Sequence, residues 1–79
     1  MKNTAEKITD ILVDKLGIAS TEVTPDANMI RDLGIDSLDY AELIMEFEQM
    51  FDIRIPDEDA EQLITVKEAV DYISKKVSK

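Results

Sequence analysis

Ser37 is the residue whose type and surroundings best suit covalent chemistry. It follows a glycine turn at Gly34 and lies between Asp36 and Asp39, at the start of a strongly amphipathic segment. A serine in this position is exposed on a rigid element and at the positive end of a helix dipole, where an attached phosphate is stabilised. An Asp-Ser pair also commonly does no more than cap a helix, so the pair alone leaves a modification site and a structural cap both open.

The composition argues against catalysis by this chain. It has no histidine and no cysteine, so the common nucleophile–base pairs cannot be assembled. The carboxylates that flank Ser37 disfavour an alkoxide, and a small helical domain offers little room for a deep catalytic cleft. We therefore predict that the protein is not an enzyme. We also predict no metal site, because thiolate ligands are absent and no EF-hand loop is present.

The charge balance indicates the kind of partner. The 79 residues include 18 acidic and 9 basic side chains, a formal net charge of −9. This excess disfavours nucleic acid and anionic membranes and favours proteins with basic surfaces. No apolar run approaches the roughly 18 residues of a membrane span, and the N-terminus lacks a signal-peptide pattern. We expect a single domain over residues 1–79, monomeric and cytoplasmic.

Helical periodicity and cap residues predict an all-α fold, a small bundle of three main helices and one short helix. The boundary signals are a capping box at Asn3 and Glu6, a C-cap at Gly17, a second helix over Ser37–Phe51, a short helix starting at Pro56 and a capping box at Thr65 and Glu68.

The long connection before Ser37 needs apolar anchors to hold it to the core. The expected anchors are Ile18, Val23, Met29, Ile30 and Leu33. The last helix should place one apolar face on the core, formed by Val66, Ala69, Val70, Ile73 and Val77.

The second predicted helix has two distinct faces. At 100° per residue its core face consists of Tyr40, Leu43, Ile44, Phe47, Met50 and Phe51. The opposite face holds a narrow apolar strip in line with Ser37, formed by Leu38, Ala41 and Met45. The acidic side chains of Glu42 and Glu48 edge this strip. Every charged residue from Asp32 to Asp52 is acidic. This face is either an ordinary solvated surface or a docking surface for basic partners, to which Met45 adapts its shape.

The run Asp32-Leu33-Gly34-Ile35-Asp36-Ser37-Leu38-Asp39 resembles the prosthetic-group site of acyl carrier proteins, of the free-standing bacterial fatty-acid type. The similarity continues through residues 23–27, 55–60 and 70–73, and so covers most of the chain. It implies a 4′-phosphopantetheine arm on Ser37, moved from coenzyme A by a phosphopantetheinyl transferase, with Asp36 orienting the transferase and its Mg²⁺. It also implies that acyl chains ride on the arm as thioesters.

The resemblance further implies which side chains meet the partner enzymes. We expect ionic contacts from Asp39, Glu42 and Glu48. We expect apolar contacts from Leu38, Ala41 and Met45. The partners are the transferase and acyl-processing enzymes with basic surfaces. Acyl cargo is expected between the second helix and residues 56–73, where small side chains among larger ones leave space.

Three departures from the commonest pattern keep the pathway open. Ile35 replaces a frequent alanine, Tyr40 a small polar residue and Ala41 a frequent valine. Tyr40 lies on the core face and would narrow an acyl cavity. The alternatives are therefore a specialised carrier for polyketide or lipid-modification chemistry and, from a different class, an unmodified acidic scaffolding or regulatory domain.

Overall fold

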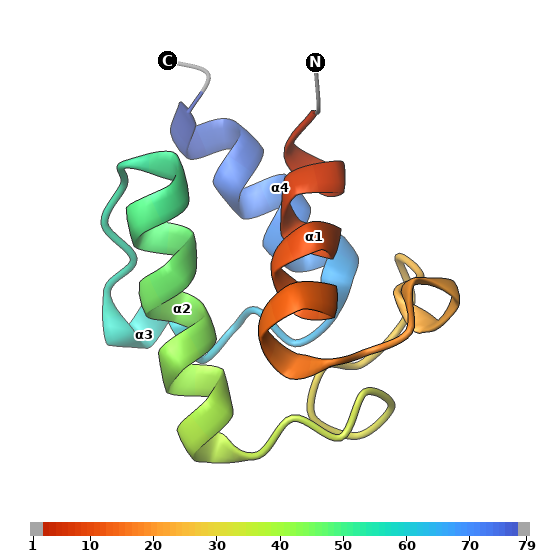
Figure 1. Ribbon diagram of the computed structural model, residues 1–79. Helices are drawn as coiled ribbons and strands as arrows, with labels where there is room; N and C mark the ends of the chain where they lie inside the picture. The colour runs from red at the N-terminus through yellow and green to blue at the C-terminus, as the bar shows by residue number, and fades with distance from the viewer. Residues whose placement is uncertain (1–2, 78–79) are drawn as a thin grey trace.

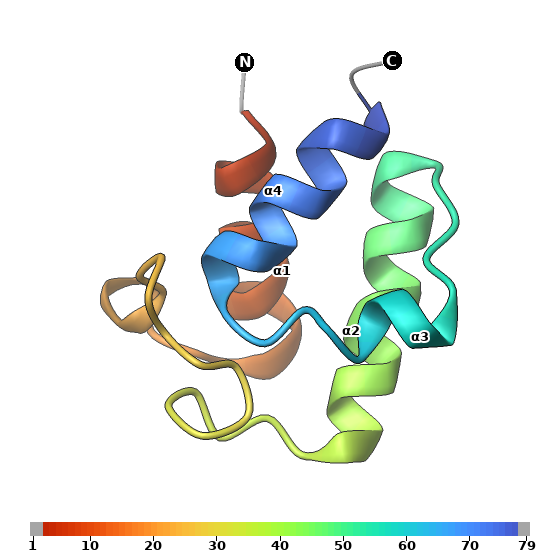
Figure 2. The same cartoon turned by 180° about the vertical axis from the view of Figure 1, so that it is seen from behind.

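The computed structural model describes residues 3–77, which form helices and no strand. In chain order the elements are α1 (Thr4–Leu16), a 3-10 turn η1 (Ser20–Glu22), α2 (Ser37–Phe51), α3 (Asp57–Ala60) and α4 (Val66–Val77). Helix α1 packs against both α2 and α4, and the short α3 lies beside α2 (Figures 1 and 2). The predicted bundle of three main helices and one short helix is confirmed. Within residues 3–77, no helix has the length and apolar character needed to cross a membrane.

Local hydrogen bonds explain where the first helix begins and ends. The Asn3 side chain accepts from the Glu6 amide at 2.8 Å, and the Asn3 amide donates to the Glu6 carboxylate at 3.0 Å. Gly17 ends α1 with φ +68°, in the left-handed region, and its amide donates to the Val13 carbonyl at 3.0 Å. Both predicted signals at the ends of α1 are therefore confirmed.

A second capping box starts α4. The Glu68 amide donates to Thr65 Oγ1 at 3.2 Å, and the Thr65 amide donates to the Glu68 carboxylate at 3.0 Å. The Glu68 carboxylate accepts from the amide of Thr65 and also from that of Ile64 at 3.1 Å, and these two bonds favour its charged form and lower its pKa.

The core lies where α1, α2 and α4 meet. Its fully buried large side chains are Ile8, Leu12, Met29, Leu43, Phe47 and Ile73. Two side chains assigned to core faces instead point to solvent: Met50 is 51% and Val77 43% exposed. Each lies in the last turn of its helix. The angular position of a residue around its helix does not show whether a neighbouring helix extends far enough along the axis to cover the last turn.

The connection between α1 and α2 is fixed by short-range and long-range bonds. Ile18 and Met29 are buried, and Val23 and Leu33 pack against the core, as predicted. Ile30 is 50% exposed, so its assignment as an anchor was wrong. It lies at the tip of a turn in which its own amide donates to the Asn28 side chain at 3.0 Å, which directs the isoleucine outward.

This connection also pairs with the start of α4. Asn28 and Thr65 form an isolated antiparallel bridge, in which the Met29 amide donates to the Ile64 carbonyl at 2.9 Å. Because α4 is itself packed on α1, the bridge holds the chain that leads to Ser37 against the bundle.

The two ends of the described chain lie at one end of the molecule. In Figure 1 α1 begins and α4 finishes near the top of the view, whereas α2 begins at the bottom.

Candidate functional site

Ser37 owes its position to the residues just before it. Gly34 adopts φ +71°, a left-handed conformation that turns the chain toward α2. Ile35 then enters the core at 3% exposure, and its amide donates to the Met29 carbonyl at 3.1 Å. The serine is thus two residues from a buried, hydrogen-bonded anchor. Ile35 was not predicted to be a core residue, although its place between a turn glycine and a cap residue is a signal in the sequence that could have indicated it.

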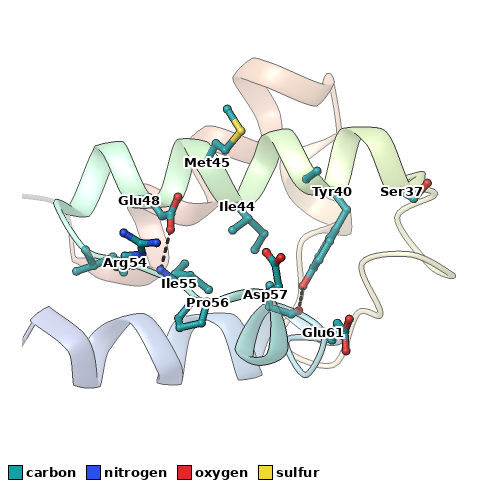
Figure 3. Close-up of a pocket in the computed structure, with 13 residues that line it drawn as sticks. Ser37, Tyr40, Ile44, Met45, Glu48, Arg54, Ile55, Pro56, Asp57 and Glu61 are labelled. Atoms are coloured by element: carbon teal, nitrogen blue, oxygen red, sulfur yellow. Dashed lines mark hydrogen bonds between the residues drawn. The ribbon is translucent and has the colours of Figure 1, made fainter.

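Ser37 itself is the first residue of α2 and is exposed. The preceding Asp36 is the N-cap, and its carboxylate accepts from the Asp39 amide at 2.8 Å. Within residues 3–77 no side chain or carbonyl bonds the Ser37 hydroxyl. Figure 3 shows this hydroxyl at the free end of the helix, pointing away from the neighbouring elements. A phosphate ester on Ser37 therefore fits without displacing another contact, and the positive end of the α2 dipole stabilises it.

The predicted apolar strip is present on α2. Leu38 is 69% and Met45 55% exposed, and Ala41 is exposed between them. Glu42 beside them is also exposed, whereas Asp39 is half-buried. We call Leu38, Ala41 and Met45 the outer strip. It starts next to Ser37 and continues for two turns along the helix.

Glu48 does not edge this strip as the helical wheel suggested. Its carboxylate turns to the other side and accepts a hydrogen bond from the Ile55 amide at 2.7 Å (Figure 3). The residue lies at the boundary between the two faces of α2, and the chain that follows α2 folds back along this boundary. The wheel describes only α2 and so could not include this returning segment.

A groove of about 920 Å³ separates α2 from the returning segment and α3. We call it the α2–α3 groove. Its α2 side consists of Ser37, Tyr40, Ala41, Ile44, Met45 and Glu48, and its other side of residues 53–57, 60 and 61. The groove therefore starts at Ser37. It overlaps in part with the space between the second helix and residues 56–73 in which acyl cargo is expected, because residues 56, 57, 60 and 61 line it and residues 62–73 do not.

Tyr40 crosses this groove. As predicted, its ring packs against the core, but its hydroxyl also donates to two carbonyl oxygens. One is that of Ala60, the last residue of α3, at 2.5 Å (Figure 3), and the other is that of Leu63, in the segment that follows α3, at 2.8 Å. Burial, and then the negative charge of Glu68, raise the pKa of Tyr40 to about 12. The hydroxyl is thus a neutral donor at physiological pH. Nothing in the sequence indicates which carbonyls it meets, since they lie 20 and 23 residues away.

The fold and site together define a small helical domain that presents one serine at a helix N-terminus, beside an apolar strip and a groove. Comparison with known proteins agrees. Residues 6–73 match the model of the family described as "Phosphopantetheine attachment site". The chain is 50% identical over 78 residues to an acyl carrier protein of Amoebophilus asiaticus, covering 99% of this chain and 98% of that protein. It is 54% identical over 71 residues to an acyl carrier protein of Chlorobium phaeobacteroides, covering 90% and 91%.

The chain therefore belongs to the acyl carrier protein family. Its role is to carry acyl groups, its cofactor is 4′-phosphopantetheine, and its partners are acyl chains and the enzymes that process them. The cofactor supplies the terminal thiol on which an acyl group is held as a thioester.

Proposed function

We propose that Ser37 is the residue that carries the 4′-phosphopantetheine arm, and that the protein delivers acyl intermediates to the enzymes of fatty-acid synthesis. The observation that carries this assignment is the exposed, unbonded Ser37 hydroxyl at the N-terminus of α2, held by the buried Ile35. The chain acts as a carrier and leaves catalysis to its partners. It works as a single, monomeric domain in the cytoplasm.

The outer strip and its acidic edge form the partner-binding face in this proposal. Leu38, Ala41 and Met45 supply apolar contacts, and Asp39 and Glu42 attract basic surfaces. The side chain of Glu48 contributes its negative charge to the same field while it holds Ile55. Binding of this kind is fast, sensitive to salt and of modest affinity, which suits a carrier that visits several enzymes in turn.

The α2–α3 groove takes the acyl chain. Ile44 and Ile55 are buried at its floor, so an apolar chain that binds there is transferred from water to an apolar surface. The groove begins beside Ser37, which keeps the arm and its cargo on the same side of the helix.

Replacement of Ser37 tests the attachment site. Wild type and Ser37→Ala are incubated with coenzyme A, Mg²⁺ and a phosphopantetheinyl transferase that converts the wild type, and intact mass is measured. The variant should fold, because the side chain is exposed and unbonded, and should gain no mass. Modification of the variant, with the group mapped to Ser20 or Ser74, would show that another serine is the site.

A second variant tests the role of Asp36. Asp36→Asn keeps an oxygen that caps α2 but removes the charge. If Asp36 orients the transferase and its Mg²⁺, this variant keeps the thermal midpoint of the wild type and is modified more slowly. An unchanged rate would reduce Asp36 to a helix cap.

The alternative of a specialised carrier rests on the unusual residues Ile35, Tyr40 and Ala41. The intact mass of the natively acylated protein distinguishes the two, because it reports the cargo directly. A ladder of saturated fatty acyl masses supports fatty-acid synthesis, and a single unusual acyl mass supports the alternative. A native protein without any added mass would instead support an unmodified scaffolding domain.

A further inference from the structure

Two hydrogen-bonded bridges cross the α2–α3 groove. Near Ser37, Tyr40 joins α2 to the end of α3. Two turns further along α2, Glu48 joins it to Ile55. Figure 3 shows Ile44 between the bridges, directed toward α3. The bridges thus mark the two ends of the apolar part of the groove.

Helix α3 depends on such bridges for its position. With four residues it is too short to be stable alone, and its last carbonyls have no partners within the helix. The Ala60 carbonyl already accepts from the Leu63 amide at 3.2 Å, so the Tyr40 hydroxyl adds a tie from another helix: it donates to the carbonyl of Ala60 and to that of Leu63, three residues after α3. A second tie comes from α4, where the Tyr72 hydroxyl donates to Asp59 at 2.6 Å. Of these two ties to α3, the one from Tyr40 crosses the groove, whereas Tyr72 does not line it.

The Tyr40 ring also stands between Ser37 and the apolar floor. Residues three apart on a helix share a face, so Tyr40 is the first groove side chain that a chain attached near Ser37 meets. Its hydroxyl bonds hold the ring across the groove and prevent it from rotating freely away.

We propose that Tyr40 is the specificity-determining residue for acyl cargo in this protein: its ring limits the length of chain that the groove admits, and its hydroxyl holds α3 as the closed wall. This inference rests on the proposed placement of the acyl chain in the α2–α3 groove. It assigns two effects to one side chain, a steric limit set by the ring and a tie made by the hydroxyl. The tie can be removed alone, and the ring and the tie can be removed together.

The test uses holo-protein loaded with straight saturated acyl groups of increasing length, from butyryl to palmitoyl. The readout is amide exchange of buried α2 residues that open only on global unfolding. Each methylene that enters the core should slow their exchange about fourfold. In the wild type we expect this slowing of exchange to stop increasing at a certain chain length, which we call the limiting length.

Three variants divide the roles. Tyr40→Ser removes the ring and leaves a hydroxyl too short to reach the Ala60 and Leu63 carbonyls, and the slowing of exchange should continue to longer chains. Tyr40→Phe keeps the ring, so the limiting length should stay that of the wild type while the holo form exchanges faster. Tyr72→Phe is the matched control: it loosens α3 from the far side and should also leave the limiting length unchanged. If Tyr40→Ser does not fold, Tyr40→Leu provides the same comparison.

Two results would overturn the proposed role of Tyr40 without affecting the proposed placement of the acyl chain. One is the same limiting length in Tyr40→Ser, or its substitute, as in the wild type. The other is an equal extension in Tyr72→Phe, which would mean that any loosening of α3 lengthens the groove. If no acyl group slows exchange in any variant, the groove takes no cargo, and both the proposed placement and the role of Tyr40 fail.

Discussion

The carboxylate of Glu48 and the backbone amide of Ile55 are joined by a hydrogen bond of 2.7 Å. This bond connects the second half of α2 to the segment that leads into α3. Glu48 therefore has a structural role in a strongly acidic helix, because its carboxylate binds the half-buried amide of Ile55.

Loss of this bond should lower stability. Glu48→Ala leaves the Ile55 amide without a partner and should reduce the free energy of unfolding by about 1–2 kcal/mol. Glu48→Gln keeps an acceptor oxygen and should cost less. Glu42→Ala, on the exposed side of the same helix, is the control and should stay within about 0.5 kcal/mol of the wild type. Urea denaturation followed by circular dichroism measures all three; equal losses at positions 48 and 42 would contradict a structural role for Glu48.

The two faces of α2 should separate binding from folding. Met45→Ala and Glu42→Lys alter the outer face and should weaken association with the transferase while the thermal midpoint changes little. For Glu42→Lys the loss should appear mainly in the association rate and diminish in high salt. Phe47→Ala alters the fully buried face and should instead cost about 3–5 kcal/mol of stability. Unchanged binding in both outer-face variants would remove this face from the docking proposal.

Stability should fall at alkaline pH because of two tyrosines. Burial raises the pKa of Tyr40 to about 12, and burial together with the hydrogen bond to Asp59 does the same for Tyr72, from an ordinary value of 10.0. Between pH 10 and 12 the unfolded chain loses these protons while the folded chain keeps them, so stability is complete below pH 10 and falls as pH rises.

Single substitutions isolate this effect from the titration of the lysines. Tyr40→Phe and Tyr72→Phe should each reduce the proton uptake on folding between pH 10 and 12 by about one proton relative to the wild type. The measurement is the slope of the unfolding free energy against pH. A slope that stays the same in the double variant would show that the tyrosines titrate alike in both states.

The end of α2 offers a stabilising change. Asp52 is its C-cap at φ +54°, a left-handed conformation, and no basic residue lies in the last turn. Its carboxylate is therefore at the negative end of the helix dipole. Asp52→Asn tolerates the same conformation without the charge and should gain about 0.3–1 kcal/mol at low ionic strength. The gain should shrink as salt is added; a thermal midpoint no higher than that of the wild type would argue against the dipole effect.

The helices and their ends could be predicted because their signals are local. Asn3 and Glu6, like Thr65 and Glu68, are three residues apart, and each pair forms its capping box from neighbouring atoms alone. The place of Ser37 at the start of a helix could be predicted for the same reason, because the cap residue Asp36 directly precedes it, whereas the prediction that it carries a prosthetic group depends on the resemblance of residues 32–39 to acyl carrier proteins. Signals of this kind need no knowledge of the rest of the fold.

The interactions that a sequence could not show are those between distant segments. The exposure of Met50 depends on how far the neighbouring helices extend. The inward turn of Glu48 depends on the chain that returns after α2, and the partners of Tyr40 lie at the end of α3 and just beyond it. The sequence indicated that Tyr40 would narrow an acyl cavity, but it could not show the carbonyls that hold this tyrosine across the groove.

The placement of both described chain ends away from the start of α2 has a consequence for attachment to other bodies. A fusion partner, a surface linker or a fluorescent label joined next to either described end would lie near the top of the molecule in Figure 1, whereas α2, whose first residue is Ser37, begins at the opposite end. With attachments at both ends, the N-terminus of α2 would still be accessible to other proteins.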